Sequence, residues 1–187
     1  SGALTDFKAP AVTAGLSSKD LQLESAFAVN GKFIKFSKFK GQYINSEFSL
    51  AGDIDVTDPS RINADIRAGL KINLDDLKEP LKNFKERLEQ IKPSGVLQVD
   101  GNLAGNINDI KSCAIEAEFS SNYISAYGLK SGDFLLNYSQ ENGIADMKFM
   151  HLSLYDGIID AVGKINLASS NLPYWITVDI QGLKIEK

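Results

Sequence analysis

One stretch of the chain keeps apolar side chains on every second residue for thirteen positions, from residue 62 to residue 74. Ile62, Ile66 and Leu70 belong to this series, and the residues between its members are polar, charged or glycine. A period of two is typical of a β-strand with one apolar face and one wet face. Similar alternation recurs over most of residues 20–187. The sequence therefore predicts a mainly β protein with an antiparallel sheet.

Short turn signals separate the predicted strands. Asn30-Gly31, Asn142-Gly143 and Asp156-Gly157 are dipeptides typical of two-residue hairpin loops. Gly41 is predicted to end the strand that starts at Lys32. The apolar parity shifts after residue 149, which predicts a β-bulge near the only histidine.

Leu74–Ile91 is the only stretch with a long helical period. Five apolar residues fall on one face of a 3.6-residue repeat, and these are Leu77, Leu81, Phe84, Leu88 and Ile91. Asp75 or Asp76 is suited to cap its start, and the segment Lys92–Gly95 is suited to stop it. Because the polar face mixes Glu with Lys, packing on the sheet is favoured over lying on a membrane surface.

The chain is predicted to form a single β-rich domain over residues 1–187. Two similar strand blocks, at about 20–74 and 95–187, are joined by the predicted helix at about 75–92. Residues 52–72 and 163–185 echo one another, because each has a strand opened by glycine, a polar turn, and a second strand ending in Gly-Leu-Lys-Ile. A repeated unit of this kind suggests a sheet that can be extended.

Composition and charge limit the partners. A hydrophobic content of 43% is enough for a core, and the formal net charge of −4 argues against nucleic acid as a partner. The single cysteine, Cys113, excludes an internal disulfide and fits a cytosolic or an envelope protein. No apolar run approaches the length of a membrane span.

The residues that carry chemistry do not form a recognisable constellation in the sequence. His151 is the only histidine, and we interpret it as a satisfied surface residue because no metal-ligand spacing surrounds it. Cys113 shares the apolar parity and is predicted to be buried. Helix capping explains Asp75, Asp76 and Glu79 without a metal. We therefore predict no catalytic residue, no metal, no cofactor and no enzyme activity.

One predicted strand is unusually rich in lysine. Its lysines alternate with phenylalanines, and the lysines are Lys32, Lys35, Lys38 and Lys40. One interpretation is contact with anionic lipid headgroups. The other is an edge strand that lysine protects from edge-to-edge pairing.

The predicted strands carry more apolar surface than one helix can cover. The shared face must either fold on itself into a U or a sandwich, or stay open to an apolar partner. A U-shaped sheet would be a groove for acyl chains, whereas a closed sandwich would be a dry core. Periodicity does not distinguish the two.

The segment GVLQVDGNLAGNINDI, residues 95–110, resembles the C-terminal region of AsmA-like proteins, which are related to TamB. The likeness covers most of residues 20–187 and rests on glycines and alternating leucines. The residues that carry it are Gly95, Leu97, Gly101, Leu103, Gly105, Gly128, Leu129, Gly143, Gly157, Gly163 and Gly182.

This resemblance implies a function and a compartment. AsmA-like proteins lie in the periplasm of diderm bacteria, are anchored in the inner membrane, and curl a β-sheet into an apolar groove for phospholipid. The chain is then expected to be a non-enzymatic lipid-handling domain, with phospholipid or another acyl-chain lipid, and further repeats or envelope proteins, as partners. The alternative is a closed β-sandwich for protein interaction or adhesion without lipid. The expected groove lining is Ile62, Ile66, Leu70, Ile72, Leu103, Ile115, Phe119, Ile165, Ile176, Val178 and Ile180.

Overall fold

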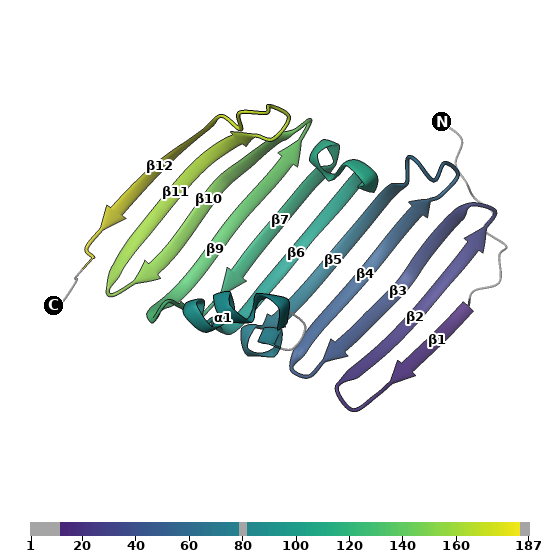
Figure 1. Ribbon diagram of the computed structural model, residues 1–187, viewed down its shortest axis with the longest axis horizontal. Helices are drawn as coiled ribbons and strands as arrows, with labels where there is room; N and C mark the ends of the chain where they lie inside the picture. The colour runs from purple at the N-terminus through teal and green to yellow at the C-terminus, as the bar shows by residue number, and fades with distance from the viewer. Residues whose placement is uncertain (1–11, 79–81, 184–187) are drawn as a thin grey trace.

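The fold is known from a computed structural model, which describes residues 12–78 and 82–183. Strands account for most of the described chain, and short helical turns lie at the strand ends (Figure 1). The strands are β1 (Val12–Ser17), β2 (Leu21–Asn30), β3 (Phe33–Tyr43), β4 (Ser46–Asp55), β5 (Asn63–Asn73), β6 (Ser94–Asn106), β7 (Ala114–Ser121), β8 (Ile124–Ala126), β9 (Leu129–Glu141), β10 (Ile144–Leu154), β11 (Gly157–Asn166) and β12 (Tyr174–Gln181).

All twelve strands belong to one antiparallel sheet. Its order is β1-β2-β3-β4-β5-β6-β7-β9-β10-β11-β12, and the short β8 pairs with β6 and β9 beyond the end of β7. Neighbours in the sheet are therefore almost always neighbours in the chain. The predicted fold class, a mainly β protein with a curled antiparallel sheet, is confirmed. Both predicted strand blocks lie in this sheet without a break between them.

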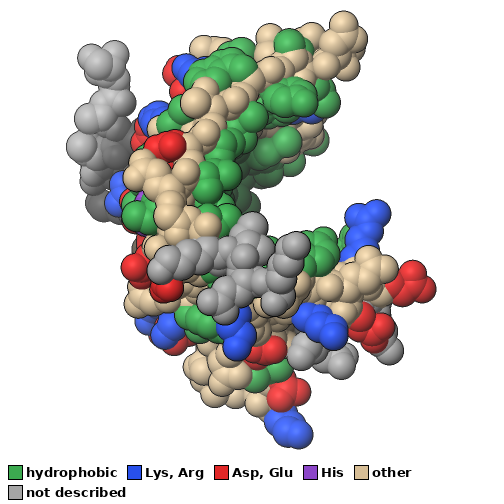
Figure 2. Space-filling view, turned by 90° about the vertical axis from the view of Figure 1, so that its left-hand side faces the viewer, with side chains coloured by type: hydrophobic (Ala, Val, Ile, Leu, Met, Phe, Trp, Pro, Cys, Tyr) green, Lys and Arg blue, Asp and Glu red, His purple; other side chains and the backbone are tan. Residues whose placement is uncertain are grey.

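The sheet curls so that one face becomes the inside of a trough. Figure 2 looks from the β12 end and shows a C-shaped section whose inner surface is mainly hydrophobic, with charged side chains on the outside. Shifts of register between Phe36 and Phe39 in β3 and between Met147 and Met150 in β10 mark β-bulges, which bend and twist a strand. The second of these confirms the bulge predicted near His151.

Gly52 lies at a position in β4 that needs glycine. Its φ of 146° is rarely adopted by other residues, and a Cβ built on it would lie 2.0 Å from the carbonyl oxygen of Asp65 in β5. Gly163 in β11 lies opposite Ile176 as Gly52 lies opposite Ile66. The two echoing sequence segments therefore place a glycine beside an isoleucine of the next strand. Ile185, the last residue of the echo, lies outside the described residues.

The prediction of one long helix over residues 74–91 is wrong. The segment holds the 3-10 turns η1 (Leu74–Lys78) and η2 (Lys82–Phe84) and the seven-residue helix α1 (Lys85–Ile91). Glu79, Pro80 and Leu81 lie outside the described residues. The predicted stop is confirmed, since Lys92 has a left-handed conformation and donates its N–H to the Leu88 carbonyl.

The helical segment leaves most of the sheet uncovered. Leu74 in η1 is buried between the ends of β5 and β6, whereas Phe84, from the predicted apolar stripe, is 53% exposed. In Figure 1 the segment lies at one end of the central strands. The described part of the segment therefore lies beside the strand ends and does not form a second layer over the sheet.

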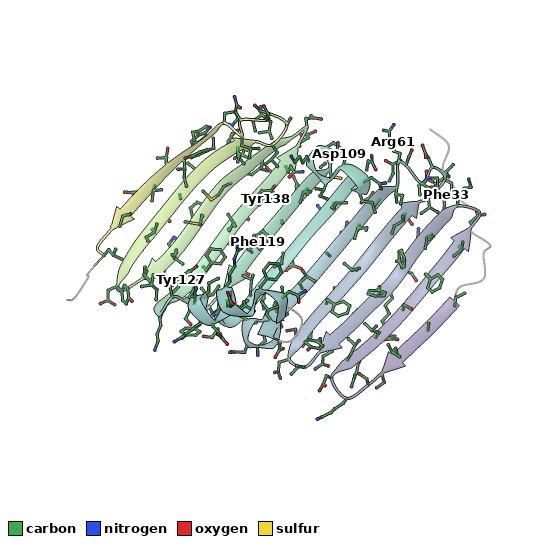
Figure 3. The ribbon with its side chains drawn as sticks, in the orientation of Figure 1. Phe33, Arg61, Asp109, Phe119, Tyr127 and Tyr138 are labelled. Carbon is green, nitrogen blue, oxygen red and sulfur yellow. The ribbon has the colours of Figure 1, made fainter. Side chains whose placement is uncertain are left out.

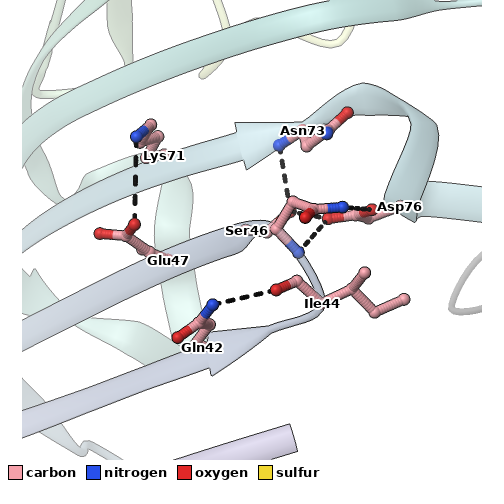
Figure 4. Close-up of polar contacts among 8 residues, drawn as sticks. Gln42, Ile44, Ser46, Glu47, Lys71, Asn73 and Asp76 are labelled. Atoms are coloured by element: carbon pink, nitrogen blue, oxygen red, sulfur yellow. Dashed lines mark hydrogen bonds and ion pairs between the residues drawn. The ribbon is translucent and has the colours of Figure 1, made fainter. Parts of the chain in front are cut away.

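Asp76 explains part of this outcome because its carboxylate bonds to a turn instead of capping a helix. It accepts hydrogen bonds from the Asn45 backbone N–H (2.9 Å), the Asn45 side-chain amide (3.2 Å) and the Ser46 hydroxyl (2.9 Å) (Figure 4). The Ser46 hydroxyl in turn accepts from the Asn73 N–H at 3.0 Å. This clasp ties the β3–β4 turn to η1, and Asp76 is only 8% exposed.

Replacing Asp76 with alanine should destabilise the protein by about 2–3 kcal/mol at neutral pH, because three donors lose a charged acceptor. Burial alone would raise the pKa of Asp76, but hydrogen bonds from Ser46 and Asn45 outweigh it and lower that pKa. A carboxyl group whose pKa is lower in the folded protein than in the unfolded chain stabilises the fold at pH values above its unfolded-state pKa. This stabilisation is lost as the pH falls through the folded-state pKa. Urea unfolding at several pH values should show the wild-type advantage shrinking in acid.

Asp76→Asn is the control for this prediction, since it keeps one acceptor oxygen and does not titrate. At neutral pH its loss of stability should be smaller than that of Asp76→Ala. Both losses should shrink in acid, because the carboxylate that titrates is the one in the wild type. An Asp76→Ala variant as stable as the wild type at neutral pH would show that the clasp does not hold the turn.

Candidate binding groove

Strand register places most of the large apolar side chains of the sheet on one face; the exceptions include Leu135, Phe149, Ile158, Val162 and Trp175. Gly52 lies opposite Ile66, Ile66 lies opposite Leu103, and Leu103 lies opposite Ile115. Directly opposite residues of neighbouring strands share a face. Following the register from strand to strand defines the groove face, whose larger side chains include Leu23, Phe27, Phe36, Phe39, Phe48, Leu50, Ile66, Leu70, Leu97, Val99, Leu103, Ile115, Phe119, Leu136, Tyr138, Met147, Met150, Leu152, Ile159, Ile165, Ile176, Val178 and Ile180.

The residues predicted to line a groove do share this face. All of them except Ile62 lie in strands and fall on it by register, and these are Ile66, Leu70, Ile72, Leu103, Ile115, Phe119, Ile165, Ile176, Val178 and Ile180. Ile62 precedes β5, and its carbonyl accepts the N–H of Ile107 at the strand ends. Figure 3 shows Phe119 and Tyr138 over the middle of the sheet, with Arg61 and Asp109 at one end of the strands and Tyr127 at the other.

The groove face is open. Few hydrophobic residues in the described part of the chain are buried, and most of them are small. They are Ala64, Leu74, Cys113, Ala145 and Ala161. At the β12 end, Ile176 and Ile180 are each 56% exposed. Among the described residues there is one sheet and no second sheet to close it. The geometry is thus a trough, not the closed sandwich that the sequence left open.

Aromatic side chains gather in the part of the groove formed by β2, β3 and β4. The ring of Phe36 lies 6.2 Å from that of Phe27 and 6.5 Å from that of Phe39, and Phe39 lies 5.9 Å from Phe48. Gly41 makes room for this cluster, because a Cβ there would overlap the Phe48 ring. The prediction that Gly41 ends its strand is wrong, since β3 continues to Tyr43.

No charged residue that is paired in a described strand falls on the groove face by register. Two polar side chains near the centre of that face, Tyr138 and Gln140, bond within the protein. The Tyr138 hydroxyl bonds to the Gln140 side-chain oxygen at 2.9 Å, and burial raises the pKa of Tyr138. The Gln140 amide donates to the carbonyls of Ile110, Lys111 and Cys113. A ligand in this groove would therefore meet apolar surface and satisfied polar groups.

The opposite face of the sheet, the outer face, is charged. Cross-strand ion pairs there include Lys38–Glu24 at 2.7 Å and Lys164–Asp146 at 3.0 Å. A hydrogen bond from Lys38 and its charge lower the pKa of Glu24. A hollow of about 760 Å³ also lies on this face, but most of the side chains around it are polar or charged. Within the described strands, the outer face carries fewer large apolar side chains than the groove face and interrupts them with charged ones.

The lysines proposed for headgroup contact divide between two places. Lys35, Lys38 and Lys40 lie on the outer face, away from the groove, and Lys35 lies 4.0 Å from Asp53. Lys32 lies in the β2–β3 turn and donates to the Thr57 carbonyl at 3.0 Å. The edge-strand interpretation is wrong, because β3 is paired on both sides, with β2 and β4.

His151 has partners that the sequence did not reveal. Its Nδ1 lies 2.7 Å from Asp160 across the β10–β11 pair, and its Nε2 lies 3.4 Å from the Ser153 hydroxyl. The order Ser–His–Asp is that of a hydrolytic relay, but such a relay also needs N–H donors aimed at an oxyanion. Ser153 lies within β10, between the partner strands β9 and β11. The prediction of a satisfied histidine is confirmed.

Cys113 is fully buried, as its parity predicted. Burial and the nearby Asp109 carboxylate raise the pKa of its thiol, so the thiolate is disfavoured. Within the described residues, no group of His, Cys, Asp and Glu side chains is arranged to hold a metal ion. No helix in that part of the chain is long and apolar enough to cross a bilayer.

Comparison with known proteins gives no match. No family model fits the chain, and neither a curated protein nor a solved structure was found to be similar to it. What the structure defines is a class of architecture, an open single-layer antiparallel sheet with an apolar inner face and a charged outer face.

Proposed function

We propose that this chain is a non-enzymatic lipid-handling domain of the cell envelope, and that it shields the acyl chains of phospholipid or another acyl-chain lipid in its groove. The observation that carries the proposal is the apolar, uncharged groove face, which runs across the whole sheet without a covering layer. Exposed apolar surface of this extent marks a binding site in soluble proteins. The resemblance to AsmA-like proteins supports the same function and a periplasmic location.

The proposed mechanism is passive. Each methylene taken out of water is stabilised by about 0.8 kcal/mol, so one long acyl chain gains on the order of 10 kcal/mol before its loss of freedom. The headgroup would stay at the ends of the strands, where polar residues such as Arg61 and Asp109 meet water (Figure 3). The acyl chains of a phospholipid need no hydrogen bond from the groove face, and Tyr138 and Gln140 on that face already bond within the protein.

The direct test is mass spectrometry of organic extracts of the purified protein. We expect acyl lipids in clear excess over an unrelated protein purified in parallel. Protein stripped of lipid should then bind a fluorescent phospholipid and be competed by unlabelled phospholipid. If the folded protein carries no lipid and takes none up, the groove serves a protein partner instead, and the interaction-module alternative is favoured.

A further inference from the structure

Among the described residues, the last strand of the sheet has one edge without a partner strand. β12 pairs with β11 along one side only, and all eight of its residues are exposed. Its sequence, YWITVDIQ, is rich in β-branched and aromatic residues and contains no proline, no lysine and a single charge. Its register with β11 has no bulge. Edge strands of soluble proteins usually contain a proline, a lysine or a β-bulge, because a free edge without them readily pairs with another strand.

The opposite edge differs in composition. β1 is six residues long and includes Ala14 and Gly15, which are poor strand formers. Figure 1 shows the two edges at opposite ends of the sheet. Of these two edge strands, β12 is therefore better suited than β1 to pair with another strand.

We propose that β12 pairs antiparallel with β12 of a second copy of this chain, about a two-fold axis through Thr177. A two-fold axis perpendicular to the sheet keeps the groove faces of both copies on one side, which requires pairs of equal parity. Centring at Thr177 pairs Tyr174 with the partner's Ile180. It also uses the full strand from Tyr174 to Ile180.

This register is self-complementary. Ile176 meets the partner's Val178, which extends the apolar row of the groove from one copy to the next. The only charged residue of the strand, Asp179, meets the partner's Trp175 and not another carboxylate. A centre at Asp179 would set two carboxylates opposite each other, which is unfavourable. The pairing needs no lipid, so it stands independently of the proposed cargo.

Two matched threonines test the proposal. Thr177 in β12 and Thr13 in β1 are both exposed, and both lie on the outer face of an edge strand. Sedimentation of lipid-free protein over a range of concentrations should show a wild-type dimer. Thr177→Lys should weaken dimerisation at least about tenfold, because two lysines meet at the axis. Thr13→Lys should leave it unchanged, and circular dichroism should show both variants folded.

A second measurement fixes the register. Thr177→Cys should give a dimer linked through residue 177 under mild oxidation, since Cys113 is buried and does not compete. Thr13→Cys should stay unlinked. A wild-type protein that is monomeric at every concentration overturns the proposal. So does a dimer that Thr177→Lys leaves intact, or one that Thr13→Lys disrupts, which would indicate head-to-tail pairing of β1 with β12.

Discussion

Replacing Leu103 with aspartate should abolish most lipid binding, with a loss of at least about tenfold in fluorescent phospholipid affinity. Leu103 lies on the groove face of β6, between Ile66 of β5 and Ile115 of β7. A carboxylate at that point must either stay hydrated, which brings water beside the acyl chain, or lose its hydration at a cost of several kcal/mol. Because Leu103 is only half-buried, the fold itself should lose no more than about 1–3 kcal/mol.

The matched control is Asn102→Asp, which adds the same charge one residue earlier in the same strand. Asn102 is exposed on the outer face, so this variant should bind lipid as the wild type does. A thermal unfolding transition first shows that both variants are folded. Titration of each with the fluorescent phospholipid then separates an effect on the groove from an effect of the added charge. Equal binding by Leu103→Asp and Asn102→Asp would mean that the trough does not hold the lipid.

Gly52→Ala should have the largest effect on stability of the substitutions considered, a loss of roughly 3–4 kcal/mol. The new methyl group would need to occupy the space of the Asp65 carbonyl oxygen in β5, and the backbone would need to keep a φ of 146° that alanine disfavours. Relief requires β4 and β5 to separate at the centre of the sheet. Urea unfolding monitored by tryptophan fluorescence and far-ultraviolet circular dichroism measures the change.

Gly132→Ala is the control for backbone effects. A Cβ at Gly132 would make ordinary contact, 3.6 Å from the Ser153 Cβ, and the backbone there is not left-handed. Stability should change by less than about 1 kcal/mol, with a small gain expected from the stiffer unfolded chain. If both alanine variants unfold at the same urea concentration, close packing of β4 against β5 is not what Gly52 provides.

Much of this architecture could be predicted from the sequence, because strand side chains alternate with a period of two. Once Ile66 and Leu70 are assigned to the apolar side, pairing in register carries the assignment to Leu103, Ile115 and, through four further strands, to Val178. The lining of the groove was predictable for this reason. That the face is open was not, because periodicity is the same for a trough and for a sandwich.

The parts that could not be predicted depend on contacts distant in the sequence. Asp76 reads as a helix cap, but Asn45 and Ser46, some thirty residues earlier, take its carboxylate. The aromatic cluster depends on Gly41 lying beneath Phe48, which reads locally as a strand ending at glycine. His151 and Asp160 meet only because a bulge in β10 sets their register.

The near-sequential order of the strands has a consequence for how such a chain changes over time. Since nearly every strand touches only the strands before and after it in the chain, a pair of strands joined by a tight turn can be gained or lost with little rearrangement elsewhere. Adding a pair of antiparallel strands reverses the chain direction twice, so the strands that follow keep their direction. The twist of the sheet and the division of side chains between its inner and outer faces are then unchanged. The length of the trough is then a quantity that evolution can adjust in steps of one hairpin, to match whatever distance must be spanned.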